Sequence, residues 1–281
     1  MPGLTSPTTV TTTLSYFSPP VDGEKPYQKV ITDPETGDRS FKRNWSGDER
    51  SNIVIENLRG KEETVSLDKT GFQFFQHTSN HTSFVNDEEI KAEYYPESVE
   101  LIKKLTGATR VEIFDHTIRK HLPELQQKSV NGPVPQVHID QSAPASIARV
   151  HRHMPVDEVP KLLEQRFQII NLWRPIHHAA YDWPLALCDY RSVDPVDVVP
   201  VALIFPDREG ETLGVKYNPN HKWKYLRGMT PDEIVLIKCF DSIQDGSVAV
   251  YTPHTGFKDP STPEEAIPRE SIELRALVFY D

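Results

Sequence analysis

The stretch Pro135-Gln136-Val137-His138-Ile139-Asp140-Gln141-Ser142 decides how the rest of this chain is interpreted. Its centre, Gln136–Asp140, has strand character, and side chains two residues apart on a strand point to the same face. His138 and Asp140 therefore converge on one side, with Ile139 on the other. A neutral imidazole and a carboxylate make two thirds of a 2-His-1-carboxylate triad, the usual ligand set of non-haem Fe(II). The stretch predicts a metal site.

This signal is weak on its own. With 11 histidines and 41 acidic residues among 281, about 1.6 His-x-acid pairs are expected by chance (11 × 41/281), and the sequence has one. A surface strand with a solvated acid is the alternative interpretation. The third ligand should be a distant histidine on a neighbouring strand. We choose His254, in the segment 250–255, for this place.

Composition narrows the class of protein. A chain of 281 residues with 37% hydrophobic residues can bury a sizeable core. The sequence contains neither an apolar run long enough to span a membrane nor a secretory signal pattern. Cys188 and Cys239 lie in apolar surroundings and suit buried thiols, so we expect a cytoplasmic protein. A net charge of −10 argues against nucleic acid or an anionic membrane as partner, and leaves a homodimer open.

Short strand patterns separated by Pro, Gly and Asp turns dominate the chain from residue 134 onward. Helices are expected at Asp87–Leu105, ending at Gly107, and at Val156–Gln165. This pattern indicates a mainly β fold with flanking helices, a double-stranded β-helix (jelly roll) with an N-terminal α/β extension. The expected strands of the second half are Gln136–Asp140, Phe167–Trp173, Leu185–Asp189, Val198–Phe205, Thr212–Tyr217, Trp223–Leu226, Ile234–Phe240, Ser247–Tyr251 and Ser271–Tyr280.

We expect residues 1–281 to form a single domain, because nothing in the sequence resembles a linker. Residues 1–26 contain a Thr-rich run and Pro19-Pro20, which predict a loosely held N-terminal arm. Residues 27–133 form the α/β extension, with a hairpin at the turn cluster Asp33–Asp38. Residues 134–281 form the metal-binding β-helix core.

The last expected strand is Arg269-Glu-Ser-Ile-Glu-Leu-Arg-Ala-Leu277. Alternation places an apolar face opposite a polar face made of Arg269, Ser271, Glu273 and Arg275. The polar face is either solvated or lines a polar site where arginine pairs with an anion. A 2-oxo dicarboxylate that chelates Fe(II) through its keto acid end needs a bidentate donor for its far carboxylate. An arginine with a neighbouring hydroxyl supplies that donor.

Several of these motifs together resemble a known family. They are similar to a fungal and bacterial family of gibberellin-desaturase-like and AsaB-type hydroxylase/desaturases, with relatives of the cephamycin 7-alpha-methoxylase subunit. The resemblance covers roughly residues 44–281. Its motifs are Phe114-Asp-His-Thr117, His138-Ile-Asp-Gln-Ser142, Asn171-Leu-Trp-Arg-Pro175, Asp182–Asp189, Tyr217-Asn-Pro219, Lys238–Ser242, Thr252–Thr255 and Arg269–Arg275.

The resemblance implies an Fe(II)/2-oxoglutarate-dependent oxygenase of secondary metabolism. His138, Asp140 and His254 would bind the iron, and Arg269 or Arg275, with Ser271, would receive the 2-oxoglutarate carboxylate. O2 is the other cosubstrate, and a small molecule is hydroxylated, desaturated or oxidatively cyclised. A non-redox cupin-type metal enzyme and a non-catalytic partner subunit of an oxygenase are the two alternatives.

Four further residues have open roles. Arg149 and His153 could line the same site if residues 149–153 alternate as in a strand, and a structural role is an equal alternative. Arg174 is either a second anion anchor or a buried arginine paired with Asp182 or Asp189. His116 is a rival metal ligand, although family order places the third ligand after the His-x-Asp pair.

Overall fold

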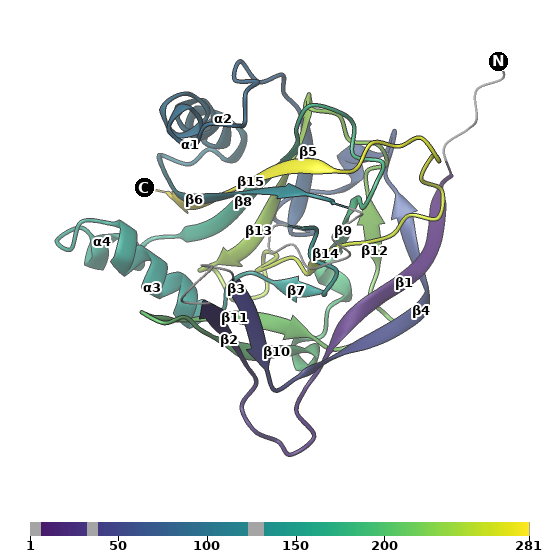
Figure 1. The fold of residues 1–281 in the computed structure, drawn as a ribbon. Coiled ribbons are helices and arrows are strands. Elements are labelled where there is room, and N and C mark those ends of the chain that lie inside the picture. The colour runs from purple at the N-terminus through teal and green to yellow at the C-terminus, as the bar shows by residue number, and fades with distance from the viewer. Residues whose placement is uncertain (1–6, 33–38, 123–131, 281) are drawn as a thin grey trace.

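The computed structural model describes residues 7–32, 39–122 and 132–280, which form two β-sheets packed face to face (Figure 1). The larger sheet has ten strands in the order β1-β4-β12-β9-β14-β7-β11-β10-β2-β3, and the smaller has five in the order β5-β13-β8-β15-β6. The strands are β1 (Thr9–Ser18), β2 (Tyr27–Thr32), β3 (Arg39–Arg43), β4 (Ser46–Asn57), β5 (Phe72–Gln76), β6 (Arg110–Lys120), β7 (His138–Ile139), β8 (Phe167–Pro175), β9 (Leu185–Cys188), β10 (Val198–Ile204), β11 (Glu209–Val215), β12 (Trp223–Tyr225), β13 (Glu233–Asp241), β14 (His254–Gly256) and β15 (Glu270–Phe279).

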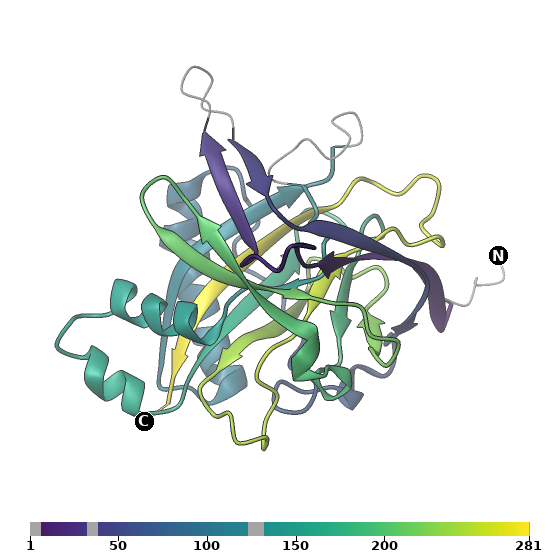
Figure 2. The ribbon, with the colours of Figure 1, turned by 90° about the horizontal axis from the view of Figure 1, so that it is seen from below.

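The helices lie at the outside of the sheets. In Figures 1 and 2, α3 and α4 project at one end of the molecule and the β1–β4 ribbon lies at the other. Within the described residues, the helices are α1 (Asp87–Glu89), a π-helical turn (Ile90–Tyr94), α2 (Tyr95–Thr106), α3 (Ala143–His153), α4 (Val159–Glu164) and three short 3-10 turns (Glu62–Thr64, Tyr190–Ser192, Pro195–Asp197). The π-helical turn explains why the apolar period of this region is broken in the sequence. Gly107 ends α2 in a left-handed conformation, as its position predicts.

Strand β15 shows how the sequence builds two layers at once. Its residues 272, 274, 276 and 278 are fully buried against α2 and its neighbours, on the outer face of the five-stranded sheet. Leu277 and Phe279 point the other way, into the core between the two sheets, together with Ser271 and Arg275. Burying each large apolar side chain stabilises the fold by about 1.5–3 kcal/mol. The outer face therefore fixes the register of β15, and with it the direction of the polar face.

The predicted fold class is confirmed, but several local predictions are wrong. Residues 9–18 are not a loosely held arm, because β1 pairs with β4 along its length and buries Leu14 and Tyr16. The expected strand at 247–251 is a loop that leads into β14. Residues 149–153 belong to α3 and do not alternate as a strand, since Ser142 caps that helix by accepting from the Ala145 N–H.

The predicted extension at 27–133 is not set apart from the core. Its strands β2, β3 and β4 join the ten-stranded sheet, while β5 and β6 form the two edges of the five-stranded sheet. β2 and β3 pair antiparallel, as the expected hairpin requires, and the turn cluster Asp33–Asp38 lies outside the described residues. The single-domain organisation stays a prediction.

Candidate metal centre

Strand pairing brings His138 and His254 together across 116 positions of sequence. β7 and β14 are antiparallel neighbours in the ten-stranded sheet, and His254 is the residue directly opposite His138. Directly opposed residues on adjacent strands have Cβ atoms about 5 Å apart. Ile139, between the two ligands of the His-x-Asp motif, points to the opposite face and packs in a separate apolar cluster. The predicted alternation of this stretch is thus confirmed.

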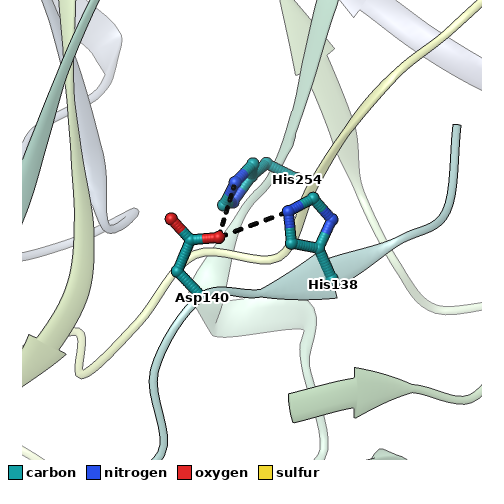
Figure 3. Close-up of side chains that lie close together, drawn as sticks. All are labelled: His138, Asp140 and His254. Atoms are coloured by element: carbon teal, nitrogen blue, oxygen red, sulfur yellow. Dashed lines mark ion pairs between the residues drawn. The ribbon is translucent and has the colours of Figure 1, made fainter. Parts of the chain in front are cut away.

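The side chains of His138, Asp140 and His254 converge on one point (Figure 3). Asp140 Oδ1 lies 3.3 Å from His138 Nε2 and 3.9 Å from His254 Nε2. One nitrogen or oxygen atom from each residue lies within 4.8 Å of the others, so one ion could contact all three. His254 is buried, whereas a fifth of the His138 side chain (21%) is accessible, so solvent reaches the centre from the His138 side.

Backbone carbonyls orient both imidazoles. His138 Nδ1 lies 2.7 Å from the Gln136 carbonyl oxygen, and His254 Nδ1 lies 3.0 Å from that of Thr252. Because a carbonyl oxygen only accepts, each Nδ1 carries the proton and each Nε2 presents a lone pair toward Asp140. Two such lone pairs and a carboxylate oxygen at these distances form a donor set that a metal cation can bridge. The donor set therefore has the chemistry of a metal site.

Two side chains donate hydrogen bonds to Oδ2, the other carboxylate oxygen of Asp140. Asn171 donates to Asp140 Oδ2 at 2.7 Å, and Arg275 Nε donates to it at 3.3 Å. Burial alone would raise the pKa of Asp140, but the contact with His138 and the charge of Arg275 outweigh it and hold the pKa well below its usual range. Burial lowers the pKa of His254, with the neighbouring His138 adding to the effect. An ionised aspartate and a neutral histidine are the forms that bind metals.

The guanidinium of Arg275 is paired with carboxylates of the protein itself. Besides Asp140, its guanidinium donates to Glu273 at 2.6 Å and to Asp115 at 3.0 Å. It also donates to Thr117 Oγ1 at 3.1 Å. A guanidinium with three carboxylate partners has little capacity left for another anion.

Arg269 is in the opposite situation. It is 2% exposed, and no carboxylate forms a salt bridge with it in the part of the chain that the structure describes. Nη1 donates to the Trp183 carbonyl oxygen at 2.5 Å, but the buried Nε has no partner there, and neither has the buried Oγ of Ser271. Burial, with the charge of Arg119 adding to it, outweighs the opposing charges of Asp182 and Glu273 and lowers the pKa of Arg269 to about 9. A buried cation and a buried hydroxyl without partners call for an anion.

Arg174 and His116 do not reach the centre. Arg174 points to the outer face of β8, where it donates to Tyr94 Oη at 3.0 Å and to the His77 carbonyl oxygen at 2.7 Å. The prediction of Arg174 as a substrate anchor is therefore wrong, and so is the pairing with Asp182 or Asp189. Arg174 has a structural role, in which it donates to backbone carbonyl oxygens. Its side chain points outward because residues 171 and 174 lie on opposite faces of β8. His116 likewise faces outward and contacts Tyr95 Oη at 2.8 Å, which excludes it as the third ligand.

Arg149 and His153 flank Phe114 near the centre. The Arg149 guanidinium carbon lies 4.9 Å from the centroid of the Phe114 ring, and the His153 ring stacks on that ring at 5.0 Å. They share one face of α3 because they are four residues apart. Phe114 is the chain neighbour of Asp115, which Arg275 contacts. The two predicted substrate residues thus contact Phe114, next to the Asp115 that Arg275 holds, and they lie on a helix and not on a strand.

The sequence interpretation missed Asn171 and Asp115. A signal for Asn171 was available, because it is the lone polar residue on the inner face of an otherwise apolar strand at 169–173. Asp115 gave no comparable signal, since its role depends on the pairing of β6 with β15.

Comparisons with known proteins agree with this geometry. A family model described as an oxidoreductase/YMDC permease-like domain matches residues 14–279. The chain is 34% identical to the hydroxylase/desaturase efuI of Hormonema carpetanum over 97% of this chain and 96% of that one. It is 31% identical to the hydroxylase/desaturase asaB of Aspergillus flavus over 82% of this chain and 80% of that one. The chain belongs to the AsaB-type hydroxylase/desaturase family.

A solved structure extends this likeness to the whole fold. The iron and alpha-ketoglutarate-dependent endoperoxidase NvfI superimposes with a TM-score of 0.83 at 27% identity, covering 98% of this chain and 99% of that one. The predicted resemblance, the jelly-roll fold and the enzyme class of Fe(II)/2-oxoglutarate-dependent oxidoreductases are thereby confirmed for this AsaB-type chain. Among the described residues, no helix is long and apolar enough to cross a membrane.

Proposed function

We propose that His138, Asp140 and His254 hold the Fe(II) of this 2-oxoglutarate-dependent oxygenase through Nε2, Oδ1 and Nε2. The convergence of these three atoms within 4.8 Å of one another is the observation that carries the proposal. Two neutral imidazoles and one carboxylate leave three coordination positions open, enough for a bidentate keto acid and O2. When bound, the iron supplies oxidative chemistry in which 2-oxoglutarate is decarboxylated to succinate and CO2 while an unactivated C–H bond is oxidised.

The final strand supplies the 2-oxoglutarate site. Arg269 and Ser271 receive the far carboxylate of the cosubstrate, and their partnerless buried atoms support this assignment. Arg275 is assigned a different task, because its charge is committed to three carboxylates including Asp140. It holds Asp140 ionised and, together with Asn171, turns Oδ1 toward the imidazoles. These outer contacts fix the direction of a ligand and set its affinity for the metal.

The substrate is a small molecule, and the reaction outcome is proposed at the level of the family. Relatives include the Fe(II)/2-oxoglutarate-dependent dioxygenase nvfI of Aspergillus novofumigatus, 30% identical over 91% of both chains. Hydroxylation, desaturation and oxidative ring closure all begin with removal of one hydrogen from the substrate, so the same residues serve each of them. The task of the protein is to place the correct hydrogen beside the metal and to keep bulk water away.

The cellular setting is proposed on composition. Cys188 and Cys239 are both free and buried, which suits a reducing compartment such as the cytoplasm. A net charge of −10 disfavours binding to nucleic acid. A homodimer stays open.

Anaerobic titration with Fe(II) and 2-oxoglutarate tests the proposal. A weak visible charge-transfer band is expected for the wild type, and none for His138→Ala or Asp140→Ala, while far-UV circular dichroism stays unchanged. Wild-type turnover in either variant would defeat the ligand assignment. Metal binding without succinate release would favour a non-redox cupin-type enzyme, and failure to bind Fe(II) would favour a non-catalytic subunit.

A further inference from the structure

Helix α3 carries a cationic side chain, Arg149, that is not paired with an acidic group among the described residues. Arg149 is half-buried, and the described residues include neither a hydrogen-bond acceptor nor a carboxylate within salt-bridge distance of its guanidinium. Its one specific contact is the face of Phe114. This differs from Arg174 and Arg275, whose guanidinium groups are surrounded by acceptors. Partial burial of an arginine without an acceptor leaves its donors available to a ligand.

The position of Arg149 suits contact with the substrate of the neighbouring centre. α3 starts directly after the His-x-Asp motif, with Ser142 as its cap. At 1.5 Å per residue, Arg149 lies about 10 Å along the helix from that cap. On the other side, Asp115 links Phe114 to Arg275, which contacts Asp140. Arg149 is therefore connected to the centre on two sides, by α3 and by the contacts of Asp115 and Arg275.

The positive charge of Arg149 itself selects the charge of the ligand. Burial lowers the pKa of Arg149, Asp115 opposes that effect, and the nearby cations Arg152 and Arg275 add to it. Asp115 is itself held by Arg275 at 3.0 Å. The half-buried Arg149 guanidinium, without an acceptor among the described residues, itself supplies the positive charge that attracts an anion, even in a chain whose net charge is −10.

The ring of Phe114 provides the second recognition element. It contacts both the Arg149 guanidinium and the His153 imidazole, and the imidazole stacks on it with an interplanar angle of 20°. The buried Nε2 of His153 has no partner among the described residues, so the stack and not a hydrogen bond holds that ring. An arginine fixed on an aromatic face is preorganised to receive a carboxylate through two parallel hydrogen bonds.

We propose that Arg149, held on Phe114, binds a carboxylate of the primary substrate, so that this enzyme oxidises a carboxylic acid. This inference rests on the proposed function, because it places the acid beside the same metal centre. It assigns Arg149 to the substrate and leaves Arg269 to 2-oxoglutarate. The two anion sites lie on different elements, α3 and the start of β15.

Calorimetric titration of the full chain loaded with Zn(II) and 2-oxoglutarate tests the inference without turnover. The probes are cinnamate, cyclohexanecarboxylate and decanoate, each paired with its primary amide. At least one acid is expected to bind more tightly than its amide. Arg149→Gln should weaken acid binding about 10- to 100-fold, the effect of losing a charge-assisted contact, and leave amide binding within about twofold. Arg149→Lys should weaken acid binding less than Arg149→Gln does, because lysine keeps the positive charge.

Arg152→Gln is the matched control, because Arg152 is an exposed arginine on the same helix. It should bind the acids as the wild type does. Equal binding of acids and amides, no acid binding, or an Arg149→Gln variant that binds acids normally would each overturn the inference. If the wild type fails to bind 2-oxoglutarate in the first titration, the proposed function itself fails and this inference with it.

Discussion

Replacing Arg269 and Arg275 by methionine, one at a time, should have opposite effects on cosubstrate binding and on stability. Arg275 lies on β15 and Arg269 directly precedes this strand, and the sequence does not distinguish them. The structure does, because Arg275 has three carboxylate partners and Arg269 has none among the described residues. Arg269→Met should therefore abolish tight 2-oxoglutarate binding, whereas Arg275→Met should damage the fold.

The magnitudes follow from the contacts. Arg269 offers two charge-assisted hydrogen bonds to the cosubstrate, each contributing about 1.5–3 kcal/mol, so Arg269→Met should raise the Kd for 2-oxoglutarate by at least about 100-fold. The same substitution removes a buried cation that lacks a carboxylate, so the free energy of unfolding without cosubstrate should change by less than about 1 kcal/mol. Arg275→Met leaves Asp140, Glu273 and Asp115 without their shared cation and should cost about 3 kcal/mol.

Two measurements check this prediction. Calorimetry with 2-oxoglutarate, on protein saturated with Zn(II), gives the Kd, and urea unfolding of the metal-free protein gives the stability. The reasoning is refuted if Arg269→Met binds 2-oxoglutarate within about threefold of the wild type. It is also refuted if Arg275→Met is as stable as the wild type while losing cosubstrate affinity.

Two further predictions concern the support of the centre, and a third concerns a buried salt bridge elsewhere in the fold. Gly71→Ala should cost more than about 2 kcal/mol and weaken Fe(II) binding, because the added Cβ would lie 2.3 Å from the hydroxyl of the residue whose carbonyl orients His254. Gly246→Ala, at a similar positive φ of +86° but in open space, isolates the backbone strain and should cost about 1 kcal/mol with Fe(II) affinity unchanged. Asn171→Ala should weaken Fe(II) binding about 10- to 100-fold in a competitive chelator assay, and unchanged affinity would mean that Asp140 needs no support. Asp241→Asn should cost about 3 kcal/mol at pH 7, because Asp241 is the buried partner of Lys238 and Arg166. Burial alone would raise the pKa of Asp241, but its bonds to these cations hold it below its usual range, so the stability it contributes is present above the unfolded pKa of about 3.9 and is lost as the pH falls through the folded value. Urea unfolding gives the free energy of unfolding of both proteins. The difference between Asp241→Asn and the wild type should therefore be smaller at pH 3 than at pH 7.

The sequence predicted the residues that depend on strand alternation. The faces of β15 and the convergence of His138 with Asp140 follow from a period of two, which is independent of what the strand packs against. The choice of His254 required only that a later strand pair with β7. Local pattern was sufficient for the first two cases, whereas the strand that carries His254, β14, was expected at 247–251 and lies at 254–256.

What the sequence did not predict depends on partners distant in the chain. Arg269 and Arg275 are equivalent by alternation, and only the pairing of β15 with β6 and the position of Asn171 on β8 make them different. The strand interpretation of residues 149–153 failed because alternating Arg and His also suits the last turns of a helix. Residues 9–18 were misread because a Thr-rich run is compatible with both an extended arm and a paired strand.

The two-faced construction of β15 constrains how this enzyme can change over evolutionary time. Inserting or deleting one residue within the strand would turn Arg275 into the apolar layer beneath α2 and Leu274 toward the metal, so both layers would fail together. Point substitutions that keep the period of two are tolerated far better. New substrate preferences should therefore arise from length variation in the segments outside this strand, such as the turn between β10 and β11, while the final strand keeps a constant length across descendants.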